Sequence, residues 1–412
     1  MSIYVLATLD TKGHEAAYVR DLLRQYGVAV RLVDVGCLGE STIAADIPRD
    51  ALFAEGGHEL TQLVRAGDRG RAVTAAAESA AKLMARLHAA GDVEGVLALG
   101  GSAGTTIGTA AMRVLPLGLP KLMVSTLASG QVRQFVSDKD ILMLNSVVDI
   151  VGLNRICRAV LSQAARAMAG MAAFKSATVE RDDRPLIAAT MFGVTTPAVE
   201  HARRVLEDAG YEVIVFHATG SGGQAMESLI AEGQFAGVLD ITTTELADEL
   251  VGGFLTAGPT RLTAAARRGV PQVVSVGATD MVNFYAPDSV PARFSGRTFC
   301  CHNANVTLMR TNPGENAAIG ADIGGKLAAA AGPVAVFLPR RGVSALDREG
   351  QPFDDPQARQ AIFDAIRHSA ESVEIVEVDR HINDPEFAAA AAKKLLEMLA
   401  SLGLENARVS YN

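Results

Sequence analysis

The sequence predicts an α/β fold of two Rossmann-like three-layer units with mainly parallel sheets, related by internal duplication. The first observation is a repeat: short apolar strands that end in Gly, Ser or Thr occur twice in the same order, so that residues 95–102 match residues 237–244. The second is that helical stretches separate these strands, which is typical of parallel sheets. We therefore divide the chain into residues 1–180 and residues 185–412.

The strand ends of such units predict where a ligand binds. In doubly wound folds, ligands lie beyond the carboxyl ends of the strands. Two units that face each other would line an interdomain cleft with those loops. The sequence therefore predicts a two-domain protein with a cleft between its domains.

The first unit alternates strands and helices almost regularly. Strands are expected at residues 3–9, 28–35, 93–99, 122–126 and 141–144, and helices at residues 13–25, 70–90 and 153–174. Gly27 is a suitable C-terminal stop for the first helix. Residues 41–69 are rich in turn residues and charge, so we expect an excursion with little regular structure. The charged stretch 180–184 is the expected linker.

The second unit repeats this pattern and then extends it. Strands are expected at residues 187–190, 211–216, 237–241, 270–275, 334–338 and 373–378, and helices up to Leu206 and at residues 313–331, 356–368 and 385–402. Residues 280–310 are polar and aromatic, which predicts a loop-rich insertion. Residues 320–326 resemble the start of a P-loop, but Asn312 and Pro313 mark a helix start and the apolar residues that follow recur every four positions. We interpret those glycines as helix-packing positions.

Composition narrows the class of protein. The chain has 412 residues, 49% of them hydrophobic and 20% charged, as in ordinary globular proteins. A net charge of −8 argues against nucleic acid or an anionic membrane as a partner and leaves a small-molecule ligand. No apolar run approaches the roughly 20 residues of a membrane span, and the N-terminus opens into a strand rather than a signal peptide. We expect a cytoplasmic protein.

The four cysteines do not suggest a disulfide framework. Cys300, Cys301 and His302 are adjacent, but neighbouring cysteines rarely bind one ion and no second Cys/His pair has zinc spacing. Structural thiols are the better interpretation.

One glycine-rich loop is the best candidate for binding phosphate. It follows an apolar strand, precedes a helix, and contains Gly100, Gly101, Ser102, Gly104, Thr105 and Thr106. Such a loop directs free N–H groups and the positive end of a helix at an anion, and glycines let the anion approach. The alternative is a tight turn whose glycines serve packing alone.

The end of the first strand carries a second candidate group. Thr8, Asp10, Thr11 and Lys12 combine hydroxyls, a carboxylate and an ammonium. Lysine neutralises phosphate, and Asp10 is a candidate ligand for Mg²⁺. The alternative is a solvated charged turn.

A third loop has the pattern of a dinucleotide fingerprint. Gly220, Gly222 and Ala225 fit G-x-G-x-x-A, and Asp240 lies 20 residues after Gly220. The motif follows the second strand of its unit, whereas the fingerprint belongs on the first. A nicotinamide-dependent oxidoreductase is therefore the weakest alternative, and we expect Gly220, Gly222 and Asp240 to be substrate-binding residues instead.

The insertion predicts a binding site for an anionic substrate. Asp280, Asn283, Arg297, His302 and Asn303 lie in this polar segment. Arginine and amide groups would bind the anion, and His302 would carry a proton, with Arg297 and Asp280 as its catalytic partners. The alternative is a polar excursion loop.

At these residues the chain resembles a known family. The strings that carry the resemblance are residues 7–13, 33–36, 99–102, 124–130, 190–197, 216–220, 280–284 and 306–311. They are similar to the Tm-one-like ATP-binding domain family, named after a tomato protein whose N-terminal domain inhibits tomato mosaic virus RNA replication. The resemblance spans essentially the whole chain.

The resemblance implies two Rossmann-like domains, ATP binding with Mg²⁺, and a homodimer, but no antiviral activity. It adds Gly36 and Ser125 to the expected cofactor-binding residues, and Thr190, Gly193 and Thr195 to the expected substrate-binding residues. The leading hypothesis is an ATP-binding metabolic enzyme that acts on a small anionic metabolite in the cleft. The alternative from another class is a non-catalytic nucleotide-binding or regulatory module.

Overall fold

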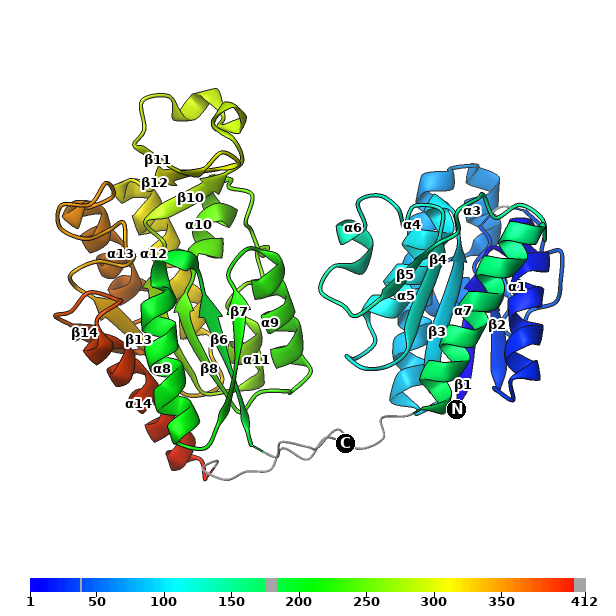
Figure 1. The fold of residues 1–412 in the computed structure, drawn as a ribbon, viewed down its shortest axis with the longest axis horizontal. Coiled ribbons are helices and arrows are strands. Elements are labelled where there is room, and N and C mark those ends of the chain that lie inside the picture. The colour runs from blue at the N-terminus through cyan, green and yellow to red at the C-terminus, as the bar shows by residue number, and fades with distance from the viewer. Residues whose placement is uncertain (38, 175–183, 404–412) are drawn as a thin grey trace. The chain divides into compact units, whose positions relative to one another are not determined.

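The structure is a computed structural model that describes residues 1–37, 39–174 and 184–403. The chain divides into two compact units, residues 1–180 and 181–412. Each unit has a parallel sheet with helices on both of its faces (Figure 1). The predicted α/β class with two Rossmann-like units is confirmed. The expected linker at residues 180–184 lies almost entirely outside the described residues.

Unit 1 contains a five-stranded sheet in the order β2-β1-β3-β4-β5, parallel throughout. Its strands are β1 (Ser2–Ala7), β2 (Val30–Asp34), β3 (Val93–Gly100), β4 (Lys121–Ser125) and β5 (Leu142–Asn145). Its helices are α1 (Leu9–Gln25), α2 (Arg49–Gly56), α3 (Leu60–Ala66), α4 (Arg69–Ala89), α5 (Ser102–Arg113), α6 (Arg133–Val136) and α7 (Arg155–Ala173). This strand order reverses direction between β1 and β3, which is the topological switch point where such folds bind ligands.

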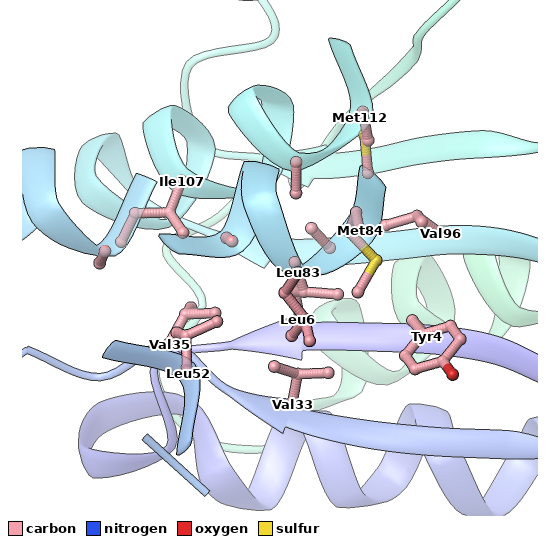
Figure 2. Close-up of a cluster of buried hydrophobic side chains, with 14 of the residues drawn as sticks. Tyr4, Leu6, Val33, Val35, Leu52, Leu83, Met84, Val96, Ile107 and Met112 are labelled. Atoms are coloured by element: carbon pink, nitrogen blue, oxygen red, sulfur yellow. The ribbon is translucent and has the colours of Figure 1, made fainter. Parts of the chain in front are cut away.

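Alternate residues of the strands of unit 1 form two hydrophobic clusters, because successive side chains of a strand point to opposite faces. Tyr4 and Leu6 of β1 pack with α2, α4 and α5 on one face (Figure 2). Ile3 and Val5 pack with α1 and α7 on the other face. The sheet is therefore buried on both sides, which fixes the carboxyl ends of its strands.

Two predictions for unit 1 were wrong in their local structure. The first strand was expected to reach residue 9 and the helix to begin at residue 13, but α1 already begins at Leu9 and has a kink at Lys12 (φ −127°). Residues 41–69 contain α2 and α3, each ended by a glycine in the left-handed region, Gly57 and Gly67. Left-handed glycines are common helix stops, so the turn residues of this segment mark helix ends.

Unit 2 has the same strand order with one strand more, β14-β13-β9-β8-β6-β7. Its strands are β6 (Leu186–Met191), β7 (Glu212–His217), β8 (Gly237–Thr242), β9 (Gln272–Gly277), β13 (Val334–Pro339) and β14 (Glu374–Val378). Its α-helices are α8 (Thr196–Asp208), α9 (Ser221–Ala231), α10 (Thr244–Val251), α11 (Ala264–Arg268), α12 (Pro313–Ala328), α13 (Pro356–Ser369) and α14 (Pro385–Ser401). Helices α8 and α14 cover one face, and α9 to α13 cover the other.

The expected loop-rich insertion contains regular structure. It forms an antiparallel sheet in the order β10-β12-β11, from β10 (Met281–Phe284), β11 (Phe299–Asn303) and β12 (Val306–Arg310). The α12 helix starts with Asn312 and Glu315 in a capping box, as the sequence predicts. No helix in the described part of the chain is long and apolar enough to cross a membrane.

Candidate functional site

A pocket opens at the switch point of unit 1, between the carboxyl ends of β1 and β3. Its volume is about 380 Å³. Its lining residues are Thr8, Asp10, Thr11, Lys12, Cys37, Arg69, Val73, Gly101, Ser102, Ala103 and Gly104. The structure thus brings the two groups predicted to bind phosphate into one site, although about 90 residues separate them in the sequence.

Two cations of this pocket have no partner among the described residues. Lys12 lies in the kinked first turns of α1, and Arg69 begins α4. Neither side chain makes a hydrogen bond or an ion pair with a described residue. Because the pocket has a single carboxylate, that of Asp10, its lining carries a formal charge of +1 (two cations, one anion). This charge favours an anionic ligand.

The N-terminus of α5 adds partial positive charge to the pocket. Its N-cap residue, Gly101, has no side chain to accept the first N–H groups, which therefore have no intrahelical partner. Thr105 donates to the carbonyl of Gly101 (2.8 Å) and contacts Ser125 (2.7 Å), and Thr106 donates to the carbonyl of Ser102 (3.0 Å). These three hydroxyls therefore hold the loop and do not line the pocket.

Gly100 does not line the pocket and packs against α5 instead. A Cβ on Gly100 would lie 2.9 Å from the Cα of Gly104, so β3 and α5 meet here too closely for any other residue. The packing explanation of this glycine is therefore correct, and only Gly101 and Gly104 reach the cavity.

Asp10 has a structural partner in addition to its place in the pocket. Its Oδ2 accepts a hydrogen bond from the N–H of Gly39 (3.1 Å), and a Cβ on Gly36 would lie 3.2 Å from its carboxyl carbon. Among the described residues no three His, Cys, Asp or Glu side chains form a group that could hold a metal ion. A magnesium ion here would need phosphate oxygens and water as its other ligands, as is common for Mg²⁺.

Asp34 fixes the loops around the pocket through the hydrogen bonds of its carboxylate. Its Oδ1 accepts hydrogen bonds from the N–H of Leu9 (3.1 Å) and of Gly36 (2.8 Å), and its Oδ2 accepts one from Ser41. The side chain is buried. One carboxylate therefore joins the start of α1 to the loop after β2.

Cys37 is the only thiol that lines the pocket in the described part of the chain. Burial raises the pKa of the Cys37 thiol to about 11, and the negative charge of Asp10 adds to the effect. The thiolate is the nucleophilic form of cysteine, so Cys37 is a poor nucleophile at neutral pH.

In the glycine loop at Gly220, a carboxylate of the protein itself binds the N–H groups that a phosphate would need. The Oε1 of Glu245 accepts hydrogen bonds from the N–H groups of Gly220 (2.7 Å) and Gly223 (3.0 Å). A Cβ on Gly222 would lie 1.9 Å from the carbonyl oxygen of His217. These N–H groups are therefore not free for a pyrophosphate, and the glycines serve packing.

Asp240 and Thr190 belong to the same buried network. Arg261 is fully buried and donates to both carboxylate oxygens of Asp240 (2.6 and 2.8 Å) and to Glu245 (2.7 Å). Thr190 donates to Asp240 (2.7 Å). The adjacent carboxylates raise the pKa of Arg261 against the opposing effect of its burial. This network leaves neither Asp240 nor Thr190 exposed to a ligand.

The switch point of unit 2 is filled by protein. Thr195 and Thr242 join the ends of their elements through their hydroxyls (2.8 Å), and both are buried. Phe192 and Val194, which flank Gly193, pack against the insertion. The equivalent strand ends of unit 1 instead line the cavity described above.

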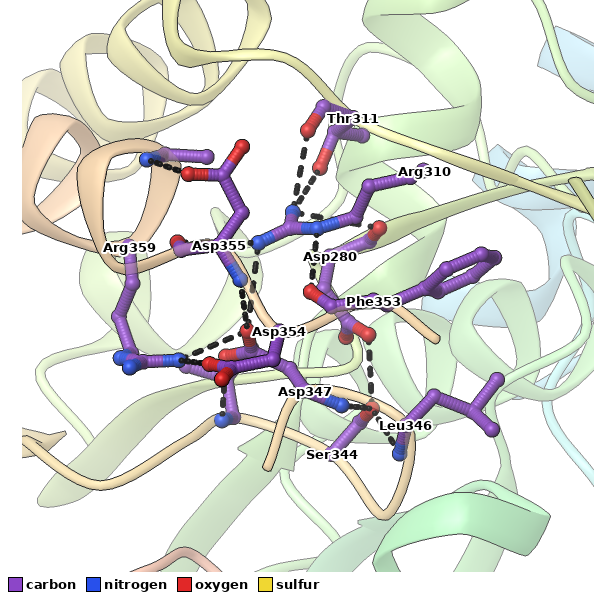
Figure 3. Close-up of polar contacts among 12 residues, drawn as sticks. Asp280, Arg310, Thr311, Ser344, Leu346, Asp347, Phe353, Asp354, Asp355 and Arg359 are labelled. Carbon is purple, nitrogen blue, oxygen red and sulfur yellow. Dashed lines mark hydrogen bonds and ion pairs between the residues drawn. The ribbon is translucent and has the colours of Figure 1, made fainter. Parts of the chain in front are cut away.

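Asp280 lies in a second buried network of unit 2 (Figure 3). Its Oδ2 accepts from Ser344 (2.7 Å), while its Oδ1 has no partner. Arg310 (3.3 Å) and Arg359 (2.8 Å) bind the neighbouring Asp347. Burial and, to a smaller extent, the negative charge of Asp347 raise the pKa of Asp280 to about 7.

The other residues predicted in the insertion do not converge on one site. Arg297 makes two hydrogen bonds to Glu315 (2.8 and 2.6 Å), and Asn283 donates to the buried Asp248 (2.6 Å). Asn303 is exposed and ends β11. The backbone of His302 lies in β11, but its side chain is outside the described part of the structure, so its catalytic role stays a prediction.

Sequence reasoning missed three residues that line the pocket of unit 1: Cys37, Arg69 and Val73. Arg69 and Val73 come from α4, whose start follows the segment that we expected to be irregular. Asp68, which caps α4 by accepting from the N–H of Arg71 (3.0 Å), is the sequence signal that could have placed this helix start.

Comparison with known proteins shows two family models that match the chain. A model of the N-terminal domain of an uncharacterised protein family (UPF0261) matches residues 1–177, and a model of its C-terminal domain matches residues 184–399. A UPF0261 protein of Clostridium tetani is 47% identical over 399 residues, which cover 96% of this chain and 98% of that protein.

The resemblance to the tomato protein is also confirmed, although the matching family has another name. The ToMV resistance protein Tm-1(GCR237) of Solanum lycopersicum is 38% identical over 418 residues, or 96% of this chain and 55% of the tomato protein. Among solved structures, UDP-GlcNAc 2-epimerase of Neisseria meningitidis is 10% identical and covers 97% of this chain and 100% of its own, with a TM-score of 0.24. A likeness this weak carries no argument.

Proposed function

The chain belongs to the UPF0261 family, and we propose that its N-terminal unit binds ATP, with the phosphates in the pocket between β1 and β3. The observation that carries this proposal is the pair of unpartnered cations, Lys12 and Arg69, beside the uncapped N-terminus of α5. Leaving cations unpaired in a pocket has no evident benefit for folding. A bound polyphosphate would supply their missing counter-charge.

Each part of the pocket has a role in this proposal. The N–H groups at the start of α5 donate hydrogen bonds to one phosphate group, as at other helix N-termini. Lys12 neutralises the phosphate oxygens, and Thr8 and Ser102 offer hydroxyl groups. Asp10 is the residue that would hold Mg²⁺, which supplies charge neutralisation between the phosphates.

The fate of the nucleotide separates two forms of the proposal. In the first, the protein is a metabolic enzyme that acts on a small anionic metabolite, and His302 in the insertion carries a proton. In the second, it is a non-catalytic nucleotide-binding or regulatory module. The absence of a Walker motif from the glycine-rich loop at residues 99–106 supports the second form. Nucleotide hydrolysis in the presence of pooled metabolites would support the first.

The resemblance also leads us to propose a homodimer. Light scattering on the purified protein gives its mass directly. A mass near 43.1 kDa, that of one chain, would reject the dimer.

Calorimetric titration of the protein with ATP and Mg²⁺ tests the binding proposal. Lys12→Ala should weaken ATP binding by roughly 10- to 150-fold, since a charge-assisted hydrogen bond contributes about 1.5–3 kcal/mol. Arg69→Ala should have a smaller effect, because Arg69 is exposed and its charge is screened by solvent.

Arg71→Ala is the matched control, since Arg71 lies two residues further along α4, is exposed and does not line this pocket. Equal ATP affinity in the wild type, Lys12→Ala and Arg69→Ala would reject the proposal.

A further inference from the structure

The pocket of unit 1 offers contacts for phosphate but no aromatic side chain, among the described residues, for a base, and its one arginine, Arg69, is assigned to the phosphates. Proteins that read a base usually stack it on an aromatic ring or an arginine plane and bond its edge. No aromatic side chain is among the described residues that line the pocket. Its apolar wall consists of small or short side chains, those of Cys37, Val73 and Ala103. Such a wall gives a base little surface to stack on.

The carboxylate that would recognise a ribose is already occupied. In dinucleotide-binding folds an acidic residue at the end of the second strand bonds the ribose hydroxyls. Asp34 holds that position here, at the end of β2. Its oxygens accept from Leu9, Gly36 and Ser41, and the side chain is 1% exposed. Asp34 therefore positions the pocket wall and has no surface for a sugar.

We propose that the unit 1 pocket selects its ligand by the polyphosphate and not by the base or the sugar. This inference rests on the proposed function and narrows it: the ligand class is any molecule with a linear chain of at least two phosphate groups. ATP is then one member of a class that includes other nucleoside triphosphates and inorganic tripolyphosphate.

The charge distribution of the pocket explains the requirement for a chain of phosphates. Lys12 comes from α1, Arg69 comes from α4, and the free N–H groups come from α5. A single phosphate cannot satisfy groups on three elements as fully as a chain can. AMP should therefore bind more weakly than ATP.

Calorimetric titrations of the full chain with four probes, at one ionic strength and one free Mg²⁺ concentration, test the inference. The probes are ATP, GTP, AMP and inorganic tripolyphosphate. We expect the dissociation constants of ATP, GTP and tripolyphosphate to agree within about threefold, because a stacked base would add roughly 5- to 150-fold. AMP should bind at least about tenfold more weakly, since it lacks the charged groups that reach the second cation.

Three variants tie the result to this pocket. Lys12→Ala should weaken ATP, GTP and tripolyphosphate by the same factor, while Arg71→Ala leaves all three unchanged. Asp34→Asn keeps an oxygen for the N–H groups of Leu9 and Gly36, so it should not change the ratio of ATP affinity to tripolyphosphate affinity. A selective loss of ATP binding in this variant would mean that Asp34 contacts the ribose, and would overturn the inference.

The outcomes separate this inference from the proposed function. Tenfold or greater preference for ATP over both GTP and tripolyphosphate would overturn the inference and leave the proposed function intact. Absence of binding by all four probes would overturn both.

Discussion

Asp280 shows at the scale of one residue how burial changes chemistry in unit 2. Burial, followed by the charge of Asp347, raises the pKa of Asp280 from its ordinary value of 3.8 to about 7. The folded state therefore binds a proton that the unfolded state releases between about pH 4 and pH 7. The contribution of Asp280 to stability is complete below about pH 4 and is lost as the pH rises to 7. We expect the melting temperature to fall between pH 5 and pH 8.

Asp280→Asn is the variant that checks this prediction. Asparagine keeps an acceptor for Ser344 and cannot ionise, so the variant should lose part of the difference in melting temperature between pH 5 and pH 8. Asp248, whose pKa burial also raises to about 7, should retain the rest. An unchanged pH dependence in Asp280→Asn would show that Asp280 is ionised in the folded protein at both pH values.

Cys37 gives a residue-scale test of occupancy. Its thiol lines the pocket of unit 1, and its raised pKa predicts slow alkylation by iodoacetamide at pH 8. Saturating ATP should slow this alkylation further, because the ligand covers the thiol. Mass spectrometry of the Cys37 peptide measures the rate, and the exposed Cys301 is an internal control that ATP should not protect. Equal protection of both thiols would point to a global effect.

At the scale of elements, two glycine-rich loops look alike in the sequence and differ in structure. A Cβ on Gly101 meets its nearest neighbour, the Oγ1 of Thr126, at 3.7 Å, which is ordinary contact. A Cβ on Gly223 would lie 2.1 Å from a carboxylate oxygen of Glu245. The first loop therefore has open space beside Gly101, whereas in the second loop Glu245 fills the space beside Gly223.

These contacts predict opposite phenotypes for two substitutions. Gly101→Val should abolish measurable ATP binding with little change in melting temperature, because the branched side chain enters a pocket that the fold leaves open. Gly223→Ala should lower unfolding free energy by about 1–3 kcal/mol, as overpacking does, and leave ATP affinity unchanged. Calorimetry and thermal melting on both variants check this. Reversed phenotypes would move the site to α9.

The sequence predicted whole elements better than their ends. Strand and helix periodicity located the two sheets, because the alternation of apolar strands with helices extends over many residues. It failed at Leu9, where Asp10, Thr11 and Lys12 resemble a turn but form the start of α1 under the tertiary hydrogen bond from Leu9 to Asp34. The same polar residue types occur at helix starts and in turns. Only the tertiary hydrogen bond therefore distinguishes a helix start from a turn here.

The sequence also predicted only part of the candidate site. The hydroxyl, lysine and glycine residues near Thr8 and Gly101 could be found because they directly follow predicted strands. Arg69 could not, since it reaches the pocket only through the packing of α4 on β1 and β3. In unit 2, Asp240 had the spacing of a ligand-binding residue, but Arg261, which neutralises it, lies 21 residues further along the chain and has no motif.

At the scale of the whole molecule, the two units share one topology but differ in structure at its switch point. Both sheets have a switch point in the same place, yet unit 1 has a cavity there and unit 2 has the Thr195–Thr242 contact. The hydrophobic clusters also separate, because each one lies within a single unit among the described residues. The expected cleft between the domains stays a prediction.

Separate hydrophobic cores predict that unit 1 folds and binds alone. A protein of residues 1–177 should show a cooperative thermal transition and bind ATP with an affinity within about threefold of that of the full chain, because the described residues that line the pocket and form the two cores all belong to unit 1. Circular dichroism and calorimetry give the two measurements. A folded fragment with much weaker ATP binding would show that unit 2 supplies ligand contacts.

The central claim is that the switch point of unit 1 binds the phosphates of a nucleotide. A crystal structure of the full chain grown with ATP and Mg²⁺ tests it most directly. We predict a triphosphate between Lys12 and the N-terminus of α5, with Arg69 against it and with Asp34 still bonded to Leu9 and Gly36. A triphosphate bound at another place in the chain, with the pocket between β1 and β3 holding only water at saturating ATP, would contradict the claim.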